Sequence, residues 1–223
     1  MAEQKSALPA HSRLKITEIF HSLQGEANSV GWPTVFVRLT GCPLRCTYCD
    51  TAYAFHGGEW TTIDHVLESV AAHGARRVCV TGGEPLAQKN CIALIKSLAD
   101  AGYAVSLETS GAMDVSHVDP RCSRVVDIKT PASGEVTRNR YDNLALLTQH
   151  DQVKFVIGDR ADYDFAREIM TEHALSERTT VLLSPSHGVV TPGELADWML
   201  ADRLHARLQV QLHKYLWGDV HGR

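Results

Sequence analysis

The chain has 223 residues, of which 44% are hydrophobic and 22% charged, with a formal net charge of −4. This composition is typical of a soluble globular domain, and its slightly acidic balance provides no basic field that would favour nucleic acid as a partner. No apolar run approaches the roughly 18 residues that span a bilayer. Residues 1–13 lack the apolar centre of a signal peptide, so we expect a flexible tail, one domain over 14–223 and a cytoplasmic location.

Strand-like and helix-like segments alternate along the chain. Strands are expected at 34–40, 76–83, 103–111, 123–130, 151–158, 179–186 and 206–213. Helices are expected at 61–74, 87–102, 161–175 and 191–204. In the first helix, Thr61 and Asp64 suit a capping box and Gly74 suits the end. Alternation of this kind predicts an α/β fold with a parallel sheet.

Several expected strands run into polar or glycine-containing turns, including "TGC", "TGGEP", "ETSG", "DIKTP" and "SPSHG". In parallel α/β folds, functional sites form where the carboxyl ends of the strands meet. The sequence therefore predicts one site to which these turns contribute together. The basic cluster "TRNR" at 137–140 is interpreted as solvated surface.

The segment "GCPLRCTYCD" places Cys42, Cys46 and Cys49 close together. In a reducing compartment, clustered cysteines indicate metal binding or catalysis more often than disulfides. Three thiolates can bind three irons of a [4Fe-4S] cluster and leave the fourth iron open. A zinc site with three protein ligands is the alternative, with His56 as a candidate addition. The other cysteines stand in apolar surroundings and are interpreted as buried hydrophobic residues: Cys79, Cys91 and Cys122.

The C-x3-C-x2-C spacing, with Tyr48 before the last cysteine, resembles the radical S-adenosylmethionine superfamily, and "TGGEP" (81–85) resembles its glycine motif. Four further segments make the chain similar to the 7-carboxy-7-deazaguanine synthase family: 16–26, 38–53, 107–111 and 211–217. The resemblance implies a shortened, incomplete (β/α)6-like partial barrel. It also implies conversion of 6-carboxy-5,6,7,8-tetrahydropterin to 7-carboxy-7-deazaguanine, with loss of ammonia and a 5′-deoxyadenosyl radical, toward queuosine and related tRNA modifications.

The resemblance assigns residues by their match to the family's motifs, and it assigns no catalytic side chain. Cys42, Cys46 and Cys49 correspond to the cluster ligands, and Thr51 to a magnesium ligand. Substrate contacts are expected from Leu23, Gln24, Gly25, Arg38 and Thr81. Arg38 suits a substrate carboxylate because its guanidinium is a planar fork. His213 and Lys214 are further candidates. The family also implies an external one-electron reductant of the flavodoxin or ferredoxin type and a homodimer.

Contacts to S-adenosylmethionine are expected from the cysteine loop and from three later turns. The expected residues are Tyr48, Cys49, Asp50, Gly83, Glu84, Glu108, Asp127, Ile128, Lys129, Ser184, Pro185, Ser186 and His187. Glu84 offers an acceptor for the cofactor's ammonium group. Glu108 suits a ribose hydroxyl or a position behind the cofactor's direct contacts, with a buried, paired carboxylate as the alternative. "DIK" (127–129) and "SPSH" (184–187) depart from the pattern of many relatives, and "WGDVHGR" continues beyond the point at which many of them stop.

Two other kinds of protein share some of these motifs. Another radical S-adenosylmethionine enzyme, such as a glycyl-radical-enzyme activase, would share the cysteines and "GGEP", but the joint presence of "SLQGE", "CDT" and "HKYLW" favours a small-molecule pocket. A non-enzymatic zinc-binding module would need a fourth ligand near the cysteines. The large α/β body argues against so limited a role.

Overall fold

A nine-stranded sheet forms the centre of the computed structural model, which describes residues 13–218, 220 and 222. The strands are β1 (Arg13–Leu23), β2 (Pro33–Leu39), β3 (Glu59–Thr62), β4 (Arg77–Gly82), β5 (Ala104–Thr109), β6 (Ser123–Asp127), β7 (Gln152–Ile157), β8 (Thr180–Pro185) and β9 (Arg207–Leu208). Their spatial order is β3-β1-β2-β4-β5-β6-β7-β8-β9. The tail expected at 1–13 lies outside the described residues, except for Arg13, which begins β1.

From β2 to β9 all neighbouring strands are parallel, as the alternation of strands and helices predicts. The antiparallel part was not predicted. It consists of β1, which pairs with both β2 and β3. The register of β1 shifts between Ile16 and Glu18. Such a bulge breaks the two-residue alternation of inward and outward side chains, and this alternation is the sequence signal for a strand.

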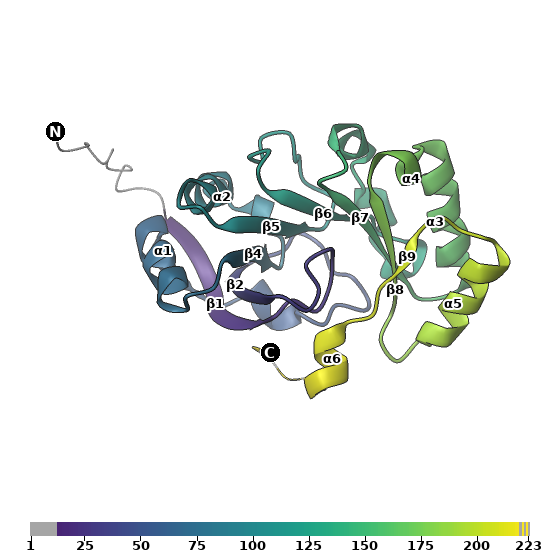
Figure 1. Cartoon of the computed structure of the whole chain (residues 1–223), viewed down its shortest axis with the longest axis horizontal. Coiled ribbons are helices and arrows are strands. Elements are labelled where there is room, and N and C mark those ends of the chain that lie inside the picture. Colours follow the sequence, from purple (N-terminus) through teal and green to yellow (C-terminus); the bar gives the residue numbers. More distant parts are fainter. Residues whose placement is uncertain (1–12, 219, 221, 223) are drawn as a thin grey trace.

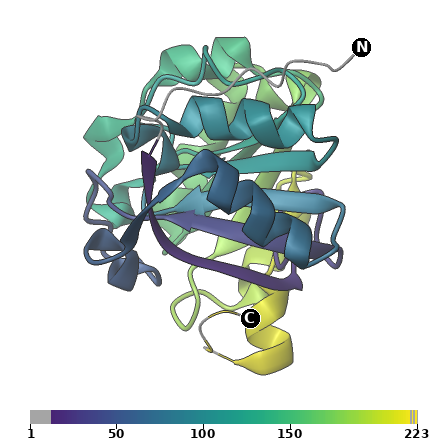
Figure 2. The same cartoon turned by 90° about the vertical axis from the view of Figure 1, so that its left-hand side faces the viewer.

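The helices are α1 (Ile63–Ala72), α2 (Cys91–Asp100), α3 (Arg160–Glu172), α4 (Leu175–Arg178), α5 (Pro192–Ala201) and α6 (Leu212–Trp217). The first five cover the outer face of the curved sheet (Figure 1). Figure 2 shows α1 and α2 lying side by side over the strands, and the two helices are in contact. The cap of α1 is Thr62 rather than Thr61, because the Thr62 side chain accepts the backbone N–H of His65.

The hydrophobic core lies between the sheet and these helices. Cys91 and Cys122 belong to it, as expected for small apolar side chains. Cys79 on β4 is also fully buried, but its side chain lines an internal cavity instead. The core therefore supports one face of the sheet and leaves the other face open for a site. Within the described residues, none of the helices has the length and apolar content needed to cross a membrane.

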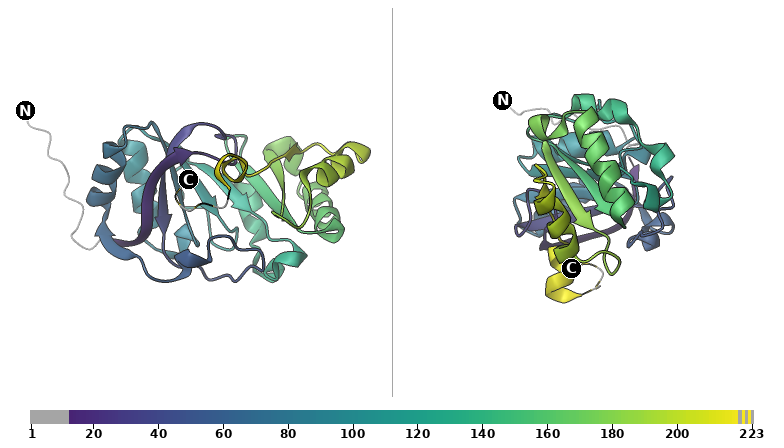
Figure 3. Two further views of the ribbon diagram at one scale, coloured as in Figure 1. Left: turned by 90° about the horizontal axis from the view of Figure 1, so that it is seen from below. Right: turned by 90° about the vertical axis from the view of Figure 1, so that its right-hand side faces the viewer.

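The C-terminal segment differs from the expected strand at 206–213. Only Arg207–Leu208 pairs with β8, and the chain then turns into α6. The backbone N–H of Leu212 donates to the carbonyl of Gly25 at 3.0 Å, so this segment binds the loop after β1 rather than continuing along the sheet. Seen from below, α6 in yellow lies between β1 in purple and the light green strands of the other end (Figure 3).

Candidate active site

A cavity of about 690 Å³ opens at the carboxyl ends of the parallel strands. This volume is in the range of small-molecule sites. Its wall includes side chains from the loop after β1, the cysteine loop, the ends of β4 to β8 and α6. The shared site predicted from the strand-end turns is therefore present. Of the residues expected at the site from sequence, all line this cavity except Glu84 and Ile128.

The cysteine loop follows β2 directly and lines the cavity with Cys42, Cys46 and Cys49. All three are free and partly buried thiols. Burial raises the pKa of Cys42 and Cys46 and so favours their neutral thiols. A bound metal centre would reverse this preference, because coordination requires thiolates. The loop is anchored to the segment after β6, because Thr47 donates through its backbone N–H to Ser133 and through its hydroxyl to Ala132.

The three cysteines fit a [4Fe-4S] cluster better than a single zinc ion. Within the described ranges, no three His, Cys, Asp or Glu side chains converge on one ion. A cluster does not need such convergence, because each cysteine binds a different iron. His56, the candidate zinc ligand, is exposed and lies outside the residues that line the cavity.

The glycine turn after β4 packs directly against the cysteine loop. A Cβ atom on Gly83 would lie 2.4 Å from the carbonyl oxygen of Gly41 and 2.7 Å from Cβ of Cys42. The next backbone N–H, of Glu84, donates to the Gly41 carbonyl at 2.8 Å. Glycine is thus required here by close approach of two backbones. This contact fixes the position of the cysteine loop relative to the end of β4.

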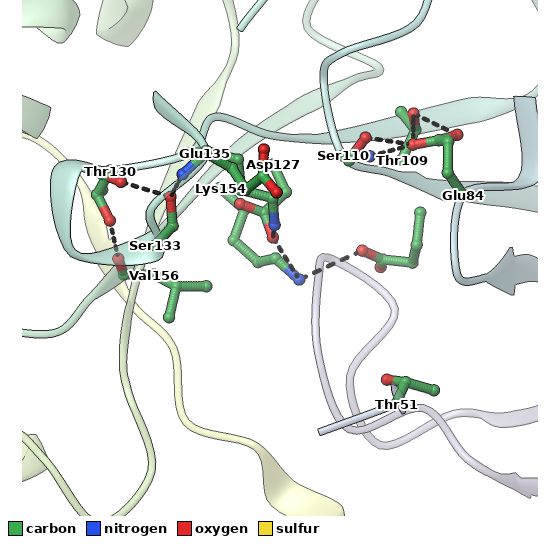
Figure 4. A network of polar contacts seen from close by, with 12 residues as sticks. Thr51, Glu84, Thr109, Ser110, Asp127, Thr130, Ser133, Glu135, Lys154 and Val156 are labelled. Carbon is green, nitrogen blue, oxygen red and sulfur yellow. Dashed lines mark hydrogen bonds and ion pairs between the residues drawn. The ribbon is translucent and has the colours of Figure 1, made fainter. Parts of the chain in front are cut away.

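Glu84 does not fit the expected role of binding the cofactor's ammonium group. Its side chain is fully buried, and the carboxylate accepts hydrogen bonds from the Thr109 hydroxyl, the Ser110 backbone and hydroxyl, and the Leu86 backbone (Figure 4). These donors use both carboxylate oxygens. Glu84 therefore joins the turn after β4 to the end of β5, and its expected contact with the cofactor is corrected to a structural one.

Ile128 also differs from expectation. Its side chain is fully buried in the core and does not line the cavity. On either side of it, Asp127 and Lys129 do line the cavity and form an ion pair at 3.0 Å. This follows from the alternation of side chains at the end of β6, which turns every second residue away from the site. The ammonium of Lys129 also lies 5.8 Å from the ring centre of Tyr48.

Arg38 points from β2 toward the cavity and is held on both sides. Its Nε donates to Glu18 at 2.7 Å, and its guanidinium lies near the rings of Phe20 and Tyr53. The Tyr53 hydroxyl donates to the same Glu18 carboxylate at 2.8 Å. An arginine oriented in this way suits a planar carboxylate ligand.

The stretch Leu23, Gln24 and Gly25 follows β1 and lines the cavity. A Cβ on Gly25 would lie 2.0 Å from Nδ1 of His213, so the imidazole packs on this glycine. The Nε2 atom of Gln24 is buried and has no hydrogen-bond partner among the described residues. A buried amide without a partner is costly, and a ligand that accepts its hydrogen bond would remove the cost.

Thr51 and Asp50 stand at the rim near α6. The Thr51 hydroxyl donates to Asp50 at 2.8 Å, and Lys214 pairs with the other oxygen of Asp50 at 3.0 Å. Burial alone would raise the pKa of Asp50, but Lys214 outweighs it, and the pKa lies well below its usual range. The Thr51 oxygen faces the cavity as a single hard ligand and so fits magnesium only if other ligands complete the shell.

Comparison with known proteins places this site in a family. A curated 7-carboxy-7-deazaguanine synthase of Koribacter versatilis is 44% identical over 92% of this chain and 97% of its own length. A second curated 7-carboxy-7-deazaguanine synthase, from Chlorobaculum tepidum, is 43% identical over 94% of this chain and 97% of its own length. The chain belongs to the 7-carboxy-7-deazaguanine synthase family. The family model of the Radical SAM superfamily matches residues 36–121, which include the three cysteines and the glycine turn.

The fold of this family member agrees with a solved structure. The crystal structure of QueE from Escherichia coli aligns with a TM-score of 0.75 at 24% identity, over 91% of this chain and 96% of that one. The fold class expected from the sequence, a shortened radical S-adenosylmethionine α/β partial barrel with a parallel sheet, is confirmed as an α/β fold of this superfamily, with a sheet that is parallel except at β1 and β3.

Sequence analysis missed a buried ionic cluster in the wall of this family member's cavity. Lys154 on β7 lies 2.9 Å from Glu26 and 3.5 Å from Glu108. Glu26 ends the quoted segment "SLQGE", and Lys154 interrupts the apolar run from Val153 to Ile157 in the strand "DQVKFVIG". A lysine in the middle of an apolar strand was the available signal, because buried lysines are rare unless paired.

Proposed function

We propose that this chain is a radical S-adenosylmethionine enzyme that converts 6-carboxy-5,6,7,8-tetrahydropterin to 7-carboxy-7-deazaguanine with loss of ammonia. One observation carries the proposal: in a chain of this family, the three cysteines line the same cavity as Arg38 and the stretch 23–25. The cavity thus offers a cluster site and a carboxylate site within one enclosure. The product is the free 7-deazapurine base that later enters queuosine and related tRNA modifications.

In this proposal, Cys42, Cys46 and Cys49 hold the [4Fe-4S] cluster. The cluster and S-adenosylmethionine, when bound, supply a 5′-deoxyadenosyl radical that removes a hydrogen atom from the substrate. The wall around the cofactor comprises Tyr48, Asp50, Gly83, Asp127, Lys129, Ser184, Pro185, Ser186 and His187. An external one-electron reductant of the flavodoxin or ferredoxin type is required for this chemistry.

The substrate would lie between the loop after β1 and Arg38. Arg38 binds its carboxylate, while Leu23, Gln24, Gly25 and Thr81 contact the ring. The unpartnered amide of Gln24 supports this placement, because a pterin carries several acceptors. Thr51 would contribute to a magnesium site that is completed by substrate and water.

A glycyl-radical-enzyme activase remains the alternative activity. Its partner is a large protein, and a backbone segment of that partner must reach the cluster. Here α6 and the loop after β1 lie against each other at the cavity, joined by the bond between Leu212 and Gly25. This arrangement favours a small-molecule substrate.

Two further properties belong to this proposal. The free thiols suit a reducing compartment such as the cytoplasm. Tyr215, Leu216 and Trp217 leave an exposed apolar surface on α6, and a second copy of the chain would cover it in a homodimer. Light scattering that gives a monomer would contradict the dimer.

The basic cluster at 137–140 is proposed to be solvated surface rather than a nucleic-acid site. Its Arg140 pairs with Asp114.

The decisive experiment uses protein purified and reconstituted without oxygen. The protein is incubated with dithionite, S-adenosylmethionine, magnesium and 6-carboxytetrahydropterin, and the products are identified by mass spectrometry. Formation of 7-carboxy-7-deazaguanine supports the proposal. Hydrogen abstraction without formation of the deazapurine would support the radical chemistry but would show that the enzyme acts on a different substrate. If protein with a full iron content shows neither hydrogen abstraction nor deazapurine formation, the proposed function is contradicted.

A further inference from the structure

Charged side chains from four separate segments meet in the cavity wall at Lys154. Its ammonium lies 2.9 Å from Glu26, 3.5 Å from Glu108 and 3.9 Å from Asp127. Lys129 pairs with Asp127 at 3.0 Å. With every group ionised, three carboxylates would face two ammonium groups in a buried wall, and this excess of one negative charge is unfavourable. One proton retained within the cluster removes the excess.

The two glutamates that flank Lys154 differ in how well they are hydrogen-bonded. Glu26 accepts from Lys154, from the Gln209 amide at 3.0 Å and from the Gln211 amide at 2.9 Å. In Glu108, Oε2 faces Lys154, while Oε1 is buried and has no hydrogen-bond partner among the described residues. Three donors stabilise an ionised carboxylate at Glu26, whereas an unpartnered oxygen at Glu108 does not.

The pKa values follow this difference. Burial alone would raise the pKa of Glu26, but Lys154 and Gln211 outweigh it and the pKa is lowered. Burial raises the pKa of Glu108 to about 7, with Glu26 and Asp127 acting in the same direction and Lys154 partly opposing them. Two neighbouring carboxyl groups with opposite shifts are a pattern of acid–base sites.

We propose that Glu108 is the acid–base residue of the ammonia-loss step, and that Lys154 and Glu26 hold it in place for this role. The inference rests on the proposed function, because it needs a substrate that releases ammonia. Glu108 lines the same cavity as Arg38 and the stretch 23–25, its side chain is 18% exposed, and its carboxyl group would exchange the proton.

The step balances without an added oxidant or reductant. The radical stage removes one hydrogen atom and returns one, so it yields an isomer of the substrate. Protonated Glu108 then donates its proton to the leaving nitrogen as the C–N bond breaks with both electrons on nitrogen. The remaining carboxylate takes a proton from the adjacent ring carbon, and that C–H electron pair forms the new double bond. The sum is loss of NH3 and regeneration of protonated Glu108.

This assignment replaces the ribose contact expected for Glu108 from the sequence. A carboxyl group that keeps its proton near neutral pH is a weaker acceptor for ribose hydroxyls than an ionised one. Asp127, which pairs with Lys129 and has its own buried and unpartnered Oδ1, is better suited to a hydroxyl donor. Glu108 and Asp127 therefore have different roles in the same cavity: proton transfer for Glu108 and acceptance of a hydroxyl hydrogen bond for Asp127.

The test compares wild type, Glu108→Gln and Glu108→Asp as reconstituted holoenzymes. The substrate carries deuterium at C6, and deuterium in the 5′ position of the cofactor reports hydrogen abstraction independently of ammonia loss. We expect Glu108→Gln to transfer deuterium, to form the deazapurine about 10²-fold more slowly or worse, and to accumulate an isomer of the substrate. Glu108→Asp should recover part of the rate. Glu168→Gln, an exposed change on α3, is the control.

A second readout does not depend on activity. Infrared difference spectra of the reconstituted protein without substrate should show a protonated carboxyl band that disappears as the pH passes through about 7. The band should be absent in Glu108→Gln and present in Glu168→Gln.

The outcomes distinguish failure of the proposed function from failure of the role of Glu108. Wild type that forms no deazapurine overturns the proposed function. Wild type that forms it, together with a Glu108→Gln variant of equal rate and unchanged pH profile, overturns only the role of Glu108. Loss of deuterium transfer in both Glu108 variants, despite a full iron content, would also overturn it, because the residue would then act before ammonia loss.

Discussion

The Nε of Arg38 donates to Oε1 of Glu18 at 2.7 Å, and this one carboxylate oxygen also accepts the hydroxyl of Tyr53. Glu18 lies on β1 and Arg38 lies opposite it on β2, so the register of the antiparallel pair sets the contact. The bulge in β1, which breaks the alternation of side chains by which a strand is predicted, lies beside this position. The strand that sequence analysis missed is thus the one that orients the arginine.

Replacing Glu18 by alanine should weaken substrate binding more than catalysis. Without its partner, Arg38 samples other orientations, and loss of a hydrogen bond to a charged group costs about 1.5–3 kcal/mol. We expect KM for the carboxylated pterin to rise by about 10-fold or more, with kcat within about 3-fold of wild type. Glu59→Ala, an exposed change on β3, is the control. A fall in kcat at unchanged KM would contradict the role of Glu18.

Gly83→Ala should lower the iron content of the reconstituted protein. The new Cβ would approach the Gly41 carbonyl to 2.4 Å, and this backbone cannot yield without moving the cysteine loop. The matched control is Gly193→Ala on α5, where an added Cβ meets nothing within 4 Å. Iron analysis and the cluster's visible absorption measure the effect. Normal iron binding in Gly83→Ala would show that the contact is not essential.

Glu84→Gln should destabilise the fold. The amide nitrogen would face donors from Thr109 or Ser110 in place of an acceptor, and each buried donor left without a partner costs about 1–3 kcal/mol. The free energy of unfolding in urea, compared with that of Glu168→Gln, measures the loss. If Glu84 instead bound the cofactor, the variant would keep its stability and lose affinity for S-adenosylmethionine.

The raised pKa of Glu108 predicts a pH-dependent stability. Between its ordinary value of 4.5 and about 7, this carboxyl stays protonated in the folded protein but ionises in the unfolded chain. The folded state binds more protons in this window, so the contribution of Glu108 to stability falls as the pH rises. Glu108→Gln lacks this loss and should gain stability relative to wild type from pH 5 to pH 7. Urea unfolding at a series of pH values measures the difference, and a constant difference would contradict the shift.

Thr51→Ala should weaken the magnesium dependence of the reaction and leave the cluster intact. The variant removes a hydroxyl oxygen at the cavity rim without touching a cysteine. A magnesium titration of the reaction rate, together with iron analysis, separates the two effects. Thr51→Ser keeps the hydroxyl and should restore the dependence. An unchanged titration in Thr51→Ala would exclude the residue as a ligand.

Local features of the sequence were sufficient to predict the cysteine loop and most of the fold. The spacing of Cys42, Cys46 and Cys49 needs only one loop, and β-branched runs between amphipathic helices predict a parallel sheet. The strand-end turns predicted a shared cavity, because parallel strands present their carboxyl ends on the same side. These signals are short-range or follow from a general rule of topology.

Tertiary structure decided the properties that depend on distant partners. The sequence predicts that Glu84 binds the cofactor, but in the structure its carboxylate accepts hydrogen bonds from Thr109 and Ser110. Gln211 belongs to a segment that reads as a strand, yet its side chain bonds Glu26 and the chain beyond it forms α6. The pKa of Glu108 is raised by burial, and Glu26 and Asp127, which lie far from it along the chain, raise it further. Burial and pairing set these properties, and both arise only when separate strands are brought side by side.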